Sequence, residues 1–254
     1  MKIRKPAVAG MFYPEDREEL KSMIDGFLRK VPDINIDGNL KALIIPHAGY
    51  IYSGQVAAYA YLFLKKYQNK KIKIVLLGPS HNVYFNDVAS DVNDYWETPL
   101  GKVKVLENNF LKAEAAHFNE HCLEVQLPFL QRILNNFEIL PLVAGDINPR
   151  EISKKIQKII DDNTLLIISS DLSHFNDYYT AVKIDTNTIN AIKNLDYNKM
   201  EREGDACGKI PILTAIDIAN QLKWKCELLD YKNSGDTARD KSRVVGYASF
   251  ALYE

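Results

Sequence analysis

Three features that define other classes of protein are scarce or missing in this 254-residue chain. It has three cysteines, far apart and without a CxxC spacing, which argues against a disulfide framework or a cysteine-rich metal cluster. Its 32 basic and 33 acidic residues nearly cancel and are scattered, so no strong field recruits nucleic acid or an anionic membrane. No apolar run approaches the roughly 18 residues of a membrane span. We therefore expect neither nucleic acid nor a membrane as a partner.

The N-terminal stretch MKIRKPAVAGMFYP carries charge and proline where a secretory signal peptide needs an uninterrupted apolar segment. The few, widely separated cysteines suit a reducing compartment. Both observations predict a cytoplasmic protein.

The chain does contain short apolar runs that alternate with helical periodicity. Runs rich in β-branched residues at 41–46, 71–80, 137–143 and 164–170 predict buried strands of a parallel sheet. An amphipathic helix is predicted at 15–28, and further helical patterns lie at 53–66, where Ser53 is the expected N-cap, and at 151–160. Alternating patterns predict a hairpin within 87–106 and two late strands at 224–232 and 242–254. We predict a single α/β domain, residues 1–254, with a mostly parallel central sheet flanked by helices.

Polar residues follow four of the predicted strands. His47 follows the first strand, His81 the second, and Asp171 and His174 the fourth, while Asp236 closes a polar turn after the strand at 224–232. Ligands of parallel sheets bind in the crevice outside the carboxyl ends of the strands. The sequence therefore predicts a ligand site that these residues share.

The residue types in this crevice are those of a metal site. Two imidazoles and one carboxylate on one face hold a redox-active non-haem iron and leave room for oxygen and substrate. For the carboxylate, Asp236, Asp171 and Glu124 are candidates, and a tetrahedral zinc site with a metal-bound water would use the same residue types.

The segment SSDLSHF has a structural and a functional interpretation that are compatible. Asp171 is expected to cap a helix that begins at Leu172, which would place His174 in its first turn, facing the crevice. There the imidazole would act as a general acid or base.

Further candidates lie away from the strand ends. His121 and Glu124 are three residues apart and would share one face of a helix, either solvated or turned to the crevice. In the second case Glu124 and Gln126 would hydrogen-bond substrate or a ligand histidine. Cys207 precedes a predicted helix, where a thiol is either reactive, with a lowered pKa, or simply buried. Tyr50 is a candidate to line an aromatic pocket.

Eight motifs occur in order along the chain: RKPAVAGMFYP, PHAGYIYSG, LLGPSHN, EHCLEVQLPFL, SSDLSHF, ACGKIPI, YKNSGD and VVGYASFAL. In this combination the sequence resembles the Memo family from Arg4 to about Leu252. The resemblance implies a fold similar to the class III extradiol dioxygenases, non-haem iron enzymes that open catechol-type rings. It also implies a pocket where the dioxygenase metal lies.

Carried over residue by residue, the family pocket corresponds here to His47, His81, Asp171 and His174. At the third pocket position, where the animal proteins of the family have a cysteine, this sequence departs from the family and has Asp236 or Thr237. The resemblance implies a metal ion, with iron first and copper or zinc as alternatives, or none. It implies a dioxygenase-like oxidoreductase, or a non-catalytic module that binds a peptide or small molecule in the same crevice. We predict metal ligands His47, His81 and Asp236, catalytic residues His174 and Asp171, and substrate-binding residues Glu124, Gln126, Tyr50 and Thr237.

Overall fold

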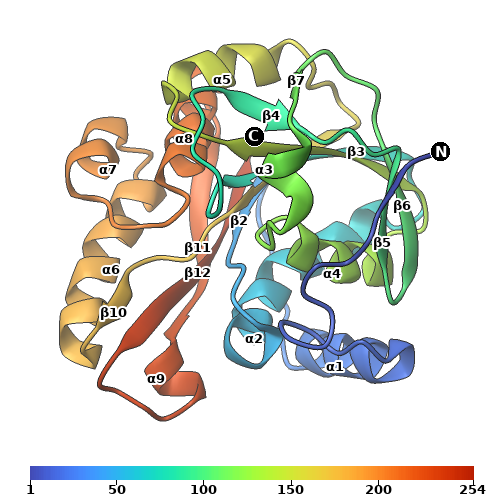
Figure 1. The fold of residues 1–254 in the computed structure, drawn as a ribbon. Coiled ribbons are helices and arrows are strands. Elements are labelled where there is room, and N and C mark those ends of the chain that lie inside the picture. Colours follow the sequence, from blue (N-terminus) through green and yellow to red (C-terminus); the bar gives the residue numbers. More distant parts are fainter.

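The computed structural model describes all of residues 1–254. A twelve-stranded sheet runs through the molecule in the order β1-β5-β6-β8-β3-β9-β2-β12-β10, with β4 paired to β7 and β8, and β11 paired to β12 (Figure 1). The strands are β1 (Ile3–Arg4), β2 (Leu40–Ile45), β3 (Ile72–Pro79), β4 (Val88–Ser90), β5 (Tyr95–Thr98), β6 (Gly101–Val105), β7 (Leu111–Lys112), β8 (Phe137–Ala144), β9 (Thr164–Ser169), β10 (His174–Asn176), β11 (Lys225–Asn233) and β12 (Val244–Tyr253).

Helices connect and cover these strands. The α-helices are α1 (Arg17–Arg29), α2 (Tyr50–Leu62), α3 (Glu114–Phe118), α4 (Leu127–Ile133), α5 (Pro149–Gln157), α6 (Tyr178–Lys193), α7 (Tyr197–Glu203), α8 (Lys209–Leu222) and α9 (Ser234–Thr237), with 3₁₀ turns at Phe63–Tyr67 and Glu124–Gln126. No helix is long and apolar enough to cross a membrane.

The centre of the sheet is parallel. Strands β8, β3, β9 and β2 are neighbours and run in one direction, while β12 pairs antiparallel to β2 and β11 antiparallel to β12. Their central residues are buried on both faces, which is why these segments read as continuous apolar runs. The predicted fold class, α/β with a mostly parallel sheet flanked by helices, is confirmed.

Two apolar cores lie on opposite faces of the sheet. One contains Leu20 and Ile24 of α1 and Tyr61 of α2, and the other contains Ile156 of α5 and Ile216 of α8. Figure 1 shows α1, α2 and α4 together on one side, and α5 to α8 on the other. The sheet is thus fixed between two helical layers, and its strand ends form a rigid base for a site.

Most local predictions hold, with differences at element ends. The helix at 15–28 forms with Asp16 as its N-cap, and β5 and β6 form the predicted hairpin. Helix α2 begins at Tyr50 instead of near Ser53, because Gly49 occupies the N-cap position, and Ser53 instead donates a hydrogen bond to the carbonyl of Ala48. The two late strands form as predicted and pair antiparallel, but the short helix α9 lies between them, where the sequence indicated no helix.

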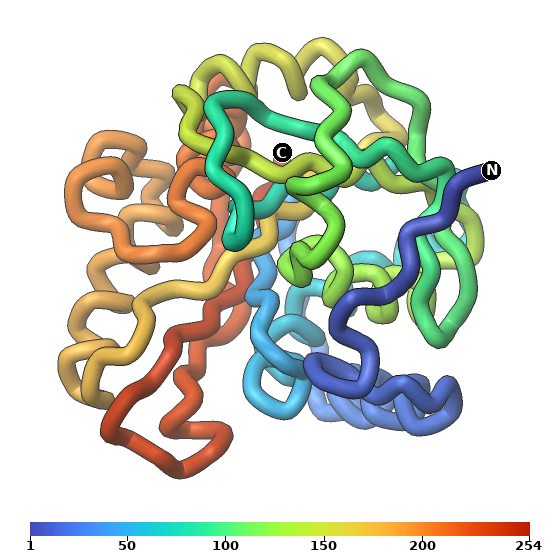
Figure 2. The backbone as a smooth tube through the Cα atoms, in the orientation of Figure 1, coloured from blue at the N-terminus to red at the C-terminus, as the bar shows by residue number.

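The N-terminal segment packs against a distant part of the chain. Figure 2 traces it past the segment that leads into α4. Arg4 donates hydrogen bonds to the carbonyls of His117 and Glu120 and forms a 2.6 Å ion pair with Glu124. Both side chains of that pair are almost completely buried. This contact fixes the position of residues 117–124, which contribute to the site described next.

Candidate metal centre

The site begins at the carboxyl ends of three neighbouring strands. β9 lies between β2 and β3, and His47 and His81 each follow the end of an outer strand by two residues. Their ring centroids are 5.1 Å apart. The two histidines that the sequence placed in one crevice therefore meet there.

A third imidazole completes the cluster. The ring of His121 lies 5.3 Å from that of His47 and 4.7 Å from that of His81. One ligand atom of each of the three histidines lies within 4.8 Å of the others, a spacing that suits a single metal ion. His121 lies just before the turn that leads into the 3₁₀ segment, and its ring faces those of His47 and His81, whereas the Glu124 side chain bonds Arg4.

The hydrogen bonds of Ser169 fix the tautomer of His47. Its hydroxyl donates to the carbonyl of Cys122 at 2.6 Å and accepts the side-chain amide of Gln126 at 2.7 Å. The Nδ1 atom of His47 lies 3.0 Å from the same oxygen and must therefore be the donor of that bond. The Nε2 atom of His47 is left with its lone pair, as a metal ligand requires.

Glu120 orients the other two histidines. Its Oε1 atom accepts the Nδ1 atom of His81 at 2.8 Å and lies 3.5 Å from Nδ1 of His121, and its Oε2 atom accepts the backbone N–H of His81 at 2.7 Å. Burial alone would raise the pKa of Glu120, but the hydrogen bonds from His81 outweigh it and lower the pKa to about 2. Such carboxylate–histidine pairs are typical around metal ligands because they fix the ring and increase its basicity.

The electrostatics of the cluster favour neutral imidazoles. Burial, with the neighbouring His81, lowers the pKa of His47 to about 3. Burial, with His47, lowers the pKa of His121 to about 4. Both rings are therefore neutral at pH 7 and have a free lone pair. Neutral imidazoles are the form in which histidine binds a divalent transition metal.

Cys122 belongs to a second grouping with His81 and Glu120, whose ligand atoms also lie within 4.8 Å of one another. Its Sγ atom lies 3.3 Å from the carbonyl of Pro79, to which it donates. The thiol is completely buried, and burial raises its pKa well above the usual value. The three-histidine group therefore offers the more accessible donors.

Asp171 and His174 are at the site, but not on a helix as the sequence suggested. The chain is extended after β9, and α6 begins at Tyr178 with Asp177 as its cap. The short strand β10 contains His174. The Oδ1 atom of Asp171 instead accepts the backbone N–H of His47 at 2.8 Å, because β2 and β9 end side by side. The capping prediction was wrong for this reason.

Burial raises the pKa of Asp171 to about 6, although the bond from His47 opposes the shift. The Oδ2 atom of Asp171 lies 4.0 Å from Nε2 of His47. The Nδ1 atom of His174 donates to the carbonyl of Leu172 at 2.8 Å, which leaves Nε2 as the ring nitrogen without that bond. The positions of both groups suit proton transfer.

Cys207 also reaches the cluster. Its Sγ atom lies 3.2 Å from Nε2 of His47, at the start of α8. Burial, with nearby Asp171, raises the pKa of this thiol to about 12. Of the two interpretations of Cys207, the reactive thiol with a lowered pKa is therefore wrong, because burial raises the pKa of the thiol more than the helix N-terminus lowers it.

The residues predicted to bind substrate make contacts within the protein. The carboxylate of Glu124 accepts four hydrogen bonds, from Arg4, Tyr13 and the backbone of Ala7 and Val8, which uses its acceptor capacity. The hydroxyl of Tyr50 donates to the carbonyl of Val125 at 2.6 Å within the core.

Gln126 is likewise buried. It accepts the hydroxyl of Tyr61 at 2.5 Å and donates to Ser169 and to the carbonyl of Pro46. Gln126 therefore supports the position of His47 through Ser169.

Asp236 and Thr237 lie in α9, at the tip of the β11–β12 pair (Figure 1). Asp236 is exposed and closes a capping box: its Oδ2 atom accepts the backbone N–H of Asn233 at 3.0 Å, and its Oδ1 atom accepts the hydroxyl of Tyr178. Thr237 is also exposed. The structure does not bring either side chain into the three-histidine group.

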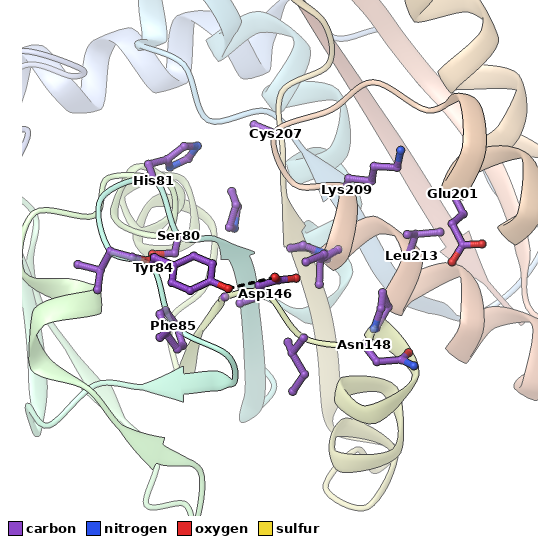
Figure 3. A pocket seen from close by; sticks show the side chains of 18 of the residues that line it. Ser80, His81, Tyr84, Phe85, Asp146, Asn148, Glu201, Cys207, Lys209 and Leu213 are labelled. Atoms are coloured by element: carbon purple, nitrogen blue, oxygen red, sulfur yellow. Dashed lines mark hydrogen bonds between the residues drawn. The ribbon is translucent and has the colours of Figure 1, made fainter.

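A cavity of about 880 Å³ opens beside the cluster. His81 and Cys207 line it together with aromatic and charged residues, and Figure 3 shows these two side chains at one end of the cavity. The wall of the cavity contains the aromatic side chains of Tyr84 and Phe85, and the hydroxyl of Tyr84 donates to Asp146. The charged residues of the lining include Asp146, Arg150, Glu201 and Lys209. Its size is that of a small-molecule site.

The sequence analysis missed Glu120 and Ser169, and it did not place His121 among the candidate metal ligands. None of these three residues follows an apolar run that ends in proline or glycine, the pattern that marked His47 and His81 as candidate metal ligands. The one available signal was the adjacency of Glu120, His121 and Cys122, three potential metal-binding side chains in a row. Whether such a segment faces a crevice depends on the N-terminal segment that holds it in place.

The sequence is similar to known proteins along nearly its whole length. The sequence model of the Memo-like protein family matches residues 4–251. The chain belongs to the Memo family. A MEMO1 family protein of Methanobrevibacter smithii is 39% identical, with 97% of this chain and 98% of that protein covered. A MEMO1 family protein of Aquifex aeolicus is 38% identical, again with 97% and 98% covered.

A solved structure also resembles this member of the Memo family. An uncharacterized protein from Escherichia coli K12 has a TM-score of 0.52 at 10% sequence identity, and the match covers 84% of this chain and 99% of that one. At this identity the likeness concerns the fold alone.

Glu120 offers a test of how the histidines are oriented. We expect Glu120→Gln to weaken Co²⁺ binding by about 10- to 100-fold, because the amide loses the charge that polarises His81 and His121. The affinity would be measured by competition with a chelator of known affinity. Glu114→Gln on α3, away from the cluster, is the control and should leave the affinity unchanged. Equal affinities in the two variants would contradict the orienting role.

Proposed function

We propose that this Memo family protein is a metal-dependent oxidoreductase that holds one metal ion, with iron first, between His47, His81 and His121. The observation that carries the proposal is the convergence of these three imidazoles within 4.8 Å. Imidazole suits iron, zinc, copper and nickel, and three protein ligands leave positions open for a substrate. His121 takes the place that the sequence analysis gave to Asp236.

A bound iron ion would supply redox chemistry, and the chain itself would position the reactants and move protons. The pKa of Asp171, raised to about 6 by burial, lies close to neutral pH, where a carboxyl group exchanges protons most readily. Its Oδ2 atom faces the ligand nitrogen of His47 at 4.0 Å. The free Nε2 atom of His174 is the second proton carrier.

The substrate in this proposal is a small organic molecule. The cavity beside His81 has the volume of a small-molecule site and mixes aromatic walls with charged groups at Lys209, Arg150 and Asp146. The parallel-strand ends that form its base are rigid, which favours a fixed orientation of the ligand. A cytoplasmic location is part of the proposal, supported by three free cysteines.

Metal content tests the proposal first. The protein is purified anaerobically without a histidine tag, beside the His47→Ala/His81→Ala double variant, and both are analysed by element-resolved mass spectrometry. We expect near-stoichiometric iron in the wild type and its loss from the double variant. Oxygen uptake with the iron-loaded protein and a panel of catechol-type and other small substrates then tests turnover.

Two results would contradict the oxidoreductase. Metal absent from both proteins, even after reconstitution, would favour a non-catalytic module that binds a peptide or small ligand in the same crevice. Iron-dependent oxygen uptake that is unchanged in the double variant would show that the turnover comes from elsewhere.

A further inference from the structure

A second cavity, of about 660 Å³, lies at the opposite end of the sheet from the histidine cluster. Lys73, near the start of β3, lines this cavity, whereas His81 follows the end of the same strand. The distance from Lys73 to Pro79 along β3 is roughly 20 Å at about 3.3 Å per residue. None of the clustered histidines is in its lining. We call it the amino-end cavity, and its apolar lining includes Val75, Leu106, Phe110, Leu140 and Ile159.

The floor and walls of the amino-end cavity are apolar. Val75 of β3 and Leu140 of β8 are paired neighbours in the sheet and form its floor, where each is 2% exposed. Leu106 and Phe110 come from the loop between β6 and β7, and Ile159 follows the end of α5. Such a lining favours a ligand with an apolar body.

Hydrogen bonds hold the loop that forms one wall. The Oδ1 atom of Asn108 accepts the backbone N–H of Phe110 at 3.1 Å, and its Nδ2 atom donates to the carbonyl of Leu106 at 2.9 Å. The same Nδ2 atom donates to the hydroxyl of Ser90 in β4, and the backbone N–H of Leu106 donates to the carbonyl of Ile139 in β8. The loop is thus tied to two strands, and a preformed wall needs no ordering when a ligand binds.

The charged residues around the cavity include one cation without a partner. They are Lys73, Asp87, Glu107, Lys155 and Lys158. The ammonium of Lys73 lies 2.7 Å from Asp161, and that of Lys155 lies 2.8 Å from Asp87. Lys158, the C-cap residue of α5, is exposed and forms no ion pair. An anionic group at the edge of the apolar floor would therefore complement Lys158.

We propose that the amino-end cavity binds a small amphipathic carboxylate, with its apolar body on the sheet floor and its carboxylate on Lys158. A volume of about 660 Å³ is within the usual range of small-molecule sites. A purely apolar ligand would leave the ammonium without a counter-ion, and a purely hydrophilic anion would leave the floor in contact with water. A ligand with both parts matches both features of the lining. The inference goes beyond the proposed oxidoreductase and does not depend on the metal centre.

Octanoate and octanol test this inference as a matched pair of ligands, because they share a chain length and differ in charge. Both are titrated into the full-length protein, with calorimetry as the direct measurement. Displacement of anilinonaphthalene sulfonate, a fluorescent amphipathic anion, is the second measurement. We expect one octanoate per chain and at least about tenfold weaker binding of octanol, which cannot form the charge-assisted bond.

Two pairs of variants locate the ligand. Lys158→Glu should weaken octanoate binding by about tenfold or more, and Lys154→Glu, an exposed change on the same helix but outside the lining, by less than about twofold. Ile159→Asn should weaken the binding of both ligands, because it removes apolar surface from the wall. Leu222→Asn is its control, since Leu222 is 40% exposed, close to the 38% of Ile159, and lies outside the cavity.

Three results would overturn the inference: no saturable octanoate binding, octanol that binds as tightly as octanoate, or Lys158→Glu with the same affinity as Lys154→Glu. The His47→Ala/His81→Ala double variant separates this cavity from the metal centre. It should bind octanoate like the wild type, even if the proposed metal site fails its own test. Loss of octanoate binding in the double variant would assign the carboxylate to the histidine cluster and contradict a site at the amino end of the sheet.

Discussion

Replacement of Glu124 by alanine is expected to lower the free energy of unfolding by about 3–5 kcal/mol, the usual cost of leaving one member of a buried ion pair without its partner. Arg4, 2.6 Å away, would remain as an uncompensated buried charge, because its side chain is only 5% exposed. The variant would also leave the hydroxyl of Tyr13 and two backbone N–H groups without their acceptor. Each such group adds to the cost.

The measurement is chemical denaturation of metal-free protein at pH 7, with thermal unfolding as a second probe. A loss of 3–5 kcal/mol corresponds to a fall in Tm of roughly 6–20 °C for a chain of this size. Lys155→Ala is the control, since it removes an exposed ion pair with Asp87 whose expected worth is about 0–1 kcal/mol. If Glu124→Ala destabilised no more than Lys155→Ala, the Arg4–Glu124 pair would not hold the N-terminal segment in place.

The same contact explains why only part of the site could be predicted. His47 and His81 were placed correctly because they follow the ends of strands, and the geometry of a parallel sheet brings those ends together whatever the details of packing. Their position depends on local patterns that a sequence displays, namely a β-branched run followed by proline or glycine and a polar side chain.

The other members of the cluster depend on contacts between segments that are far apart in the sequence. His121 faces the crevice because Arg4, more than a hundred residues away, bonds the carbonyl of Glu120 and the carboxylate of Glu124 on either side of it. Cys207 reaches His47 across a sequence separation of 160 residues. No periodicity or spacing in the sequence indicates such contacts. Asp236 is the opposite case: it follows a strand in the sequence, as a site residue would, but its carboxylate takes part in the capping box of α9.

His121→Ala is expected to reduce the affinity for Co²⁺ by more than about 100-fold. Changes in the residues that only orient metal ligands typically cost 10- to 100-fold, and loss of a ligand nitrogen should cost more. The remaining pair, His47 and His81, would hold the ion with two imidazoles and whatever other donors can reach it. The cobalt spectrum should change as well, because the number of nitrogen ligands falls.

His174→Ala provides the matched control. This imidazole lies close enough to affect the pKa of His47 and of Asp171, but its side chain is outside the group whose ligand atoms converge. We expect the affinity to change less than about tenfold, whereas proton-dependent turnover, once a substrate is found, should fall by about 10²–10⁴-fold. If His174→Ala abolished cobalt binding and His121→Ala did not, the ion would have to lie on the Asp171 side of His47, and the three-histidine site would be wrong.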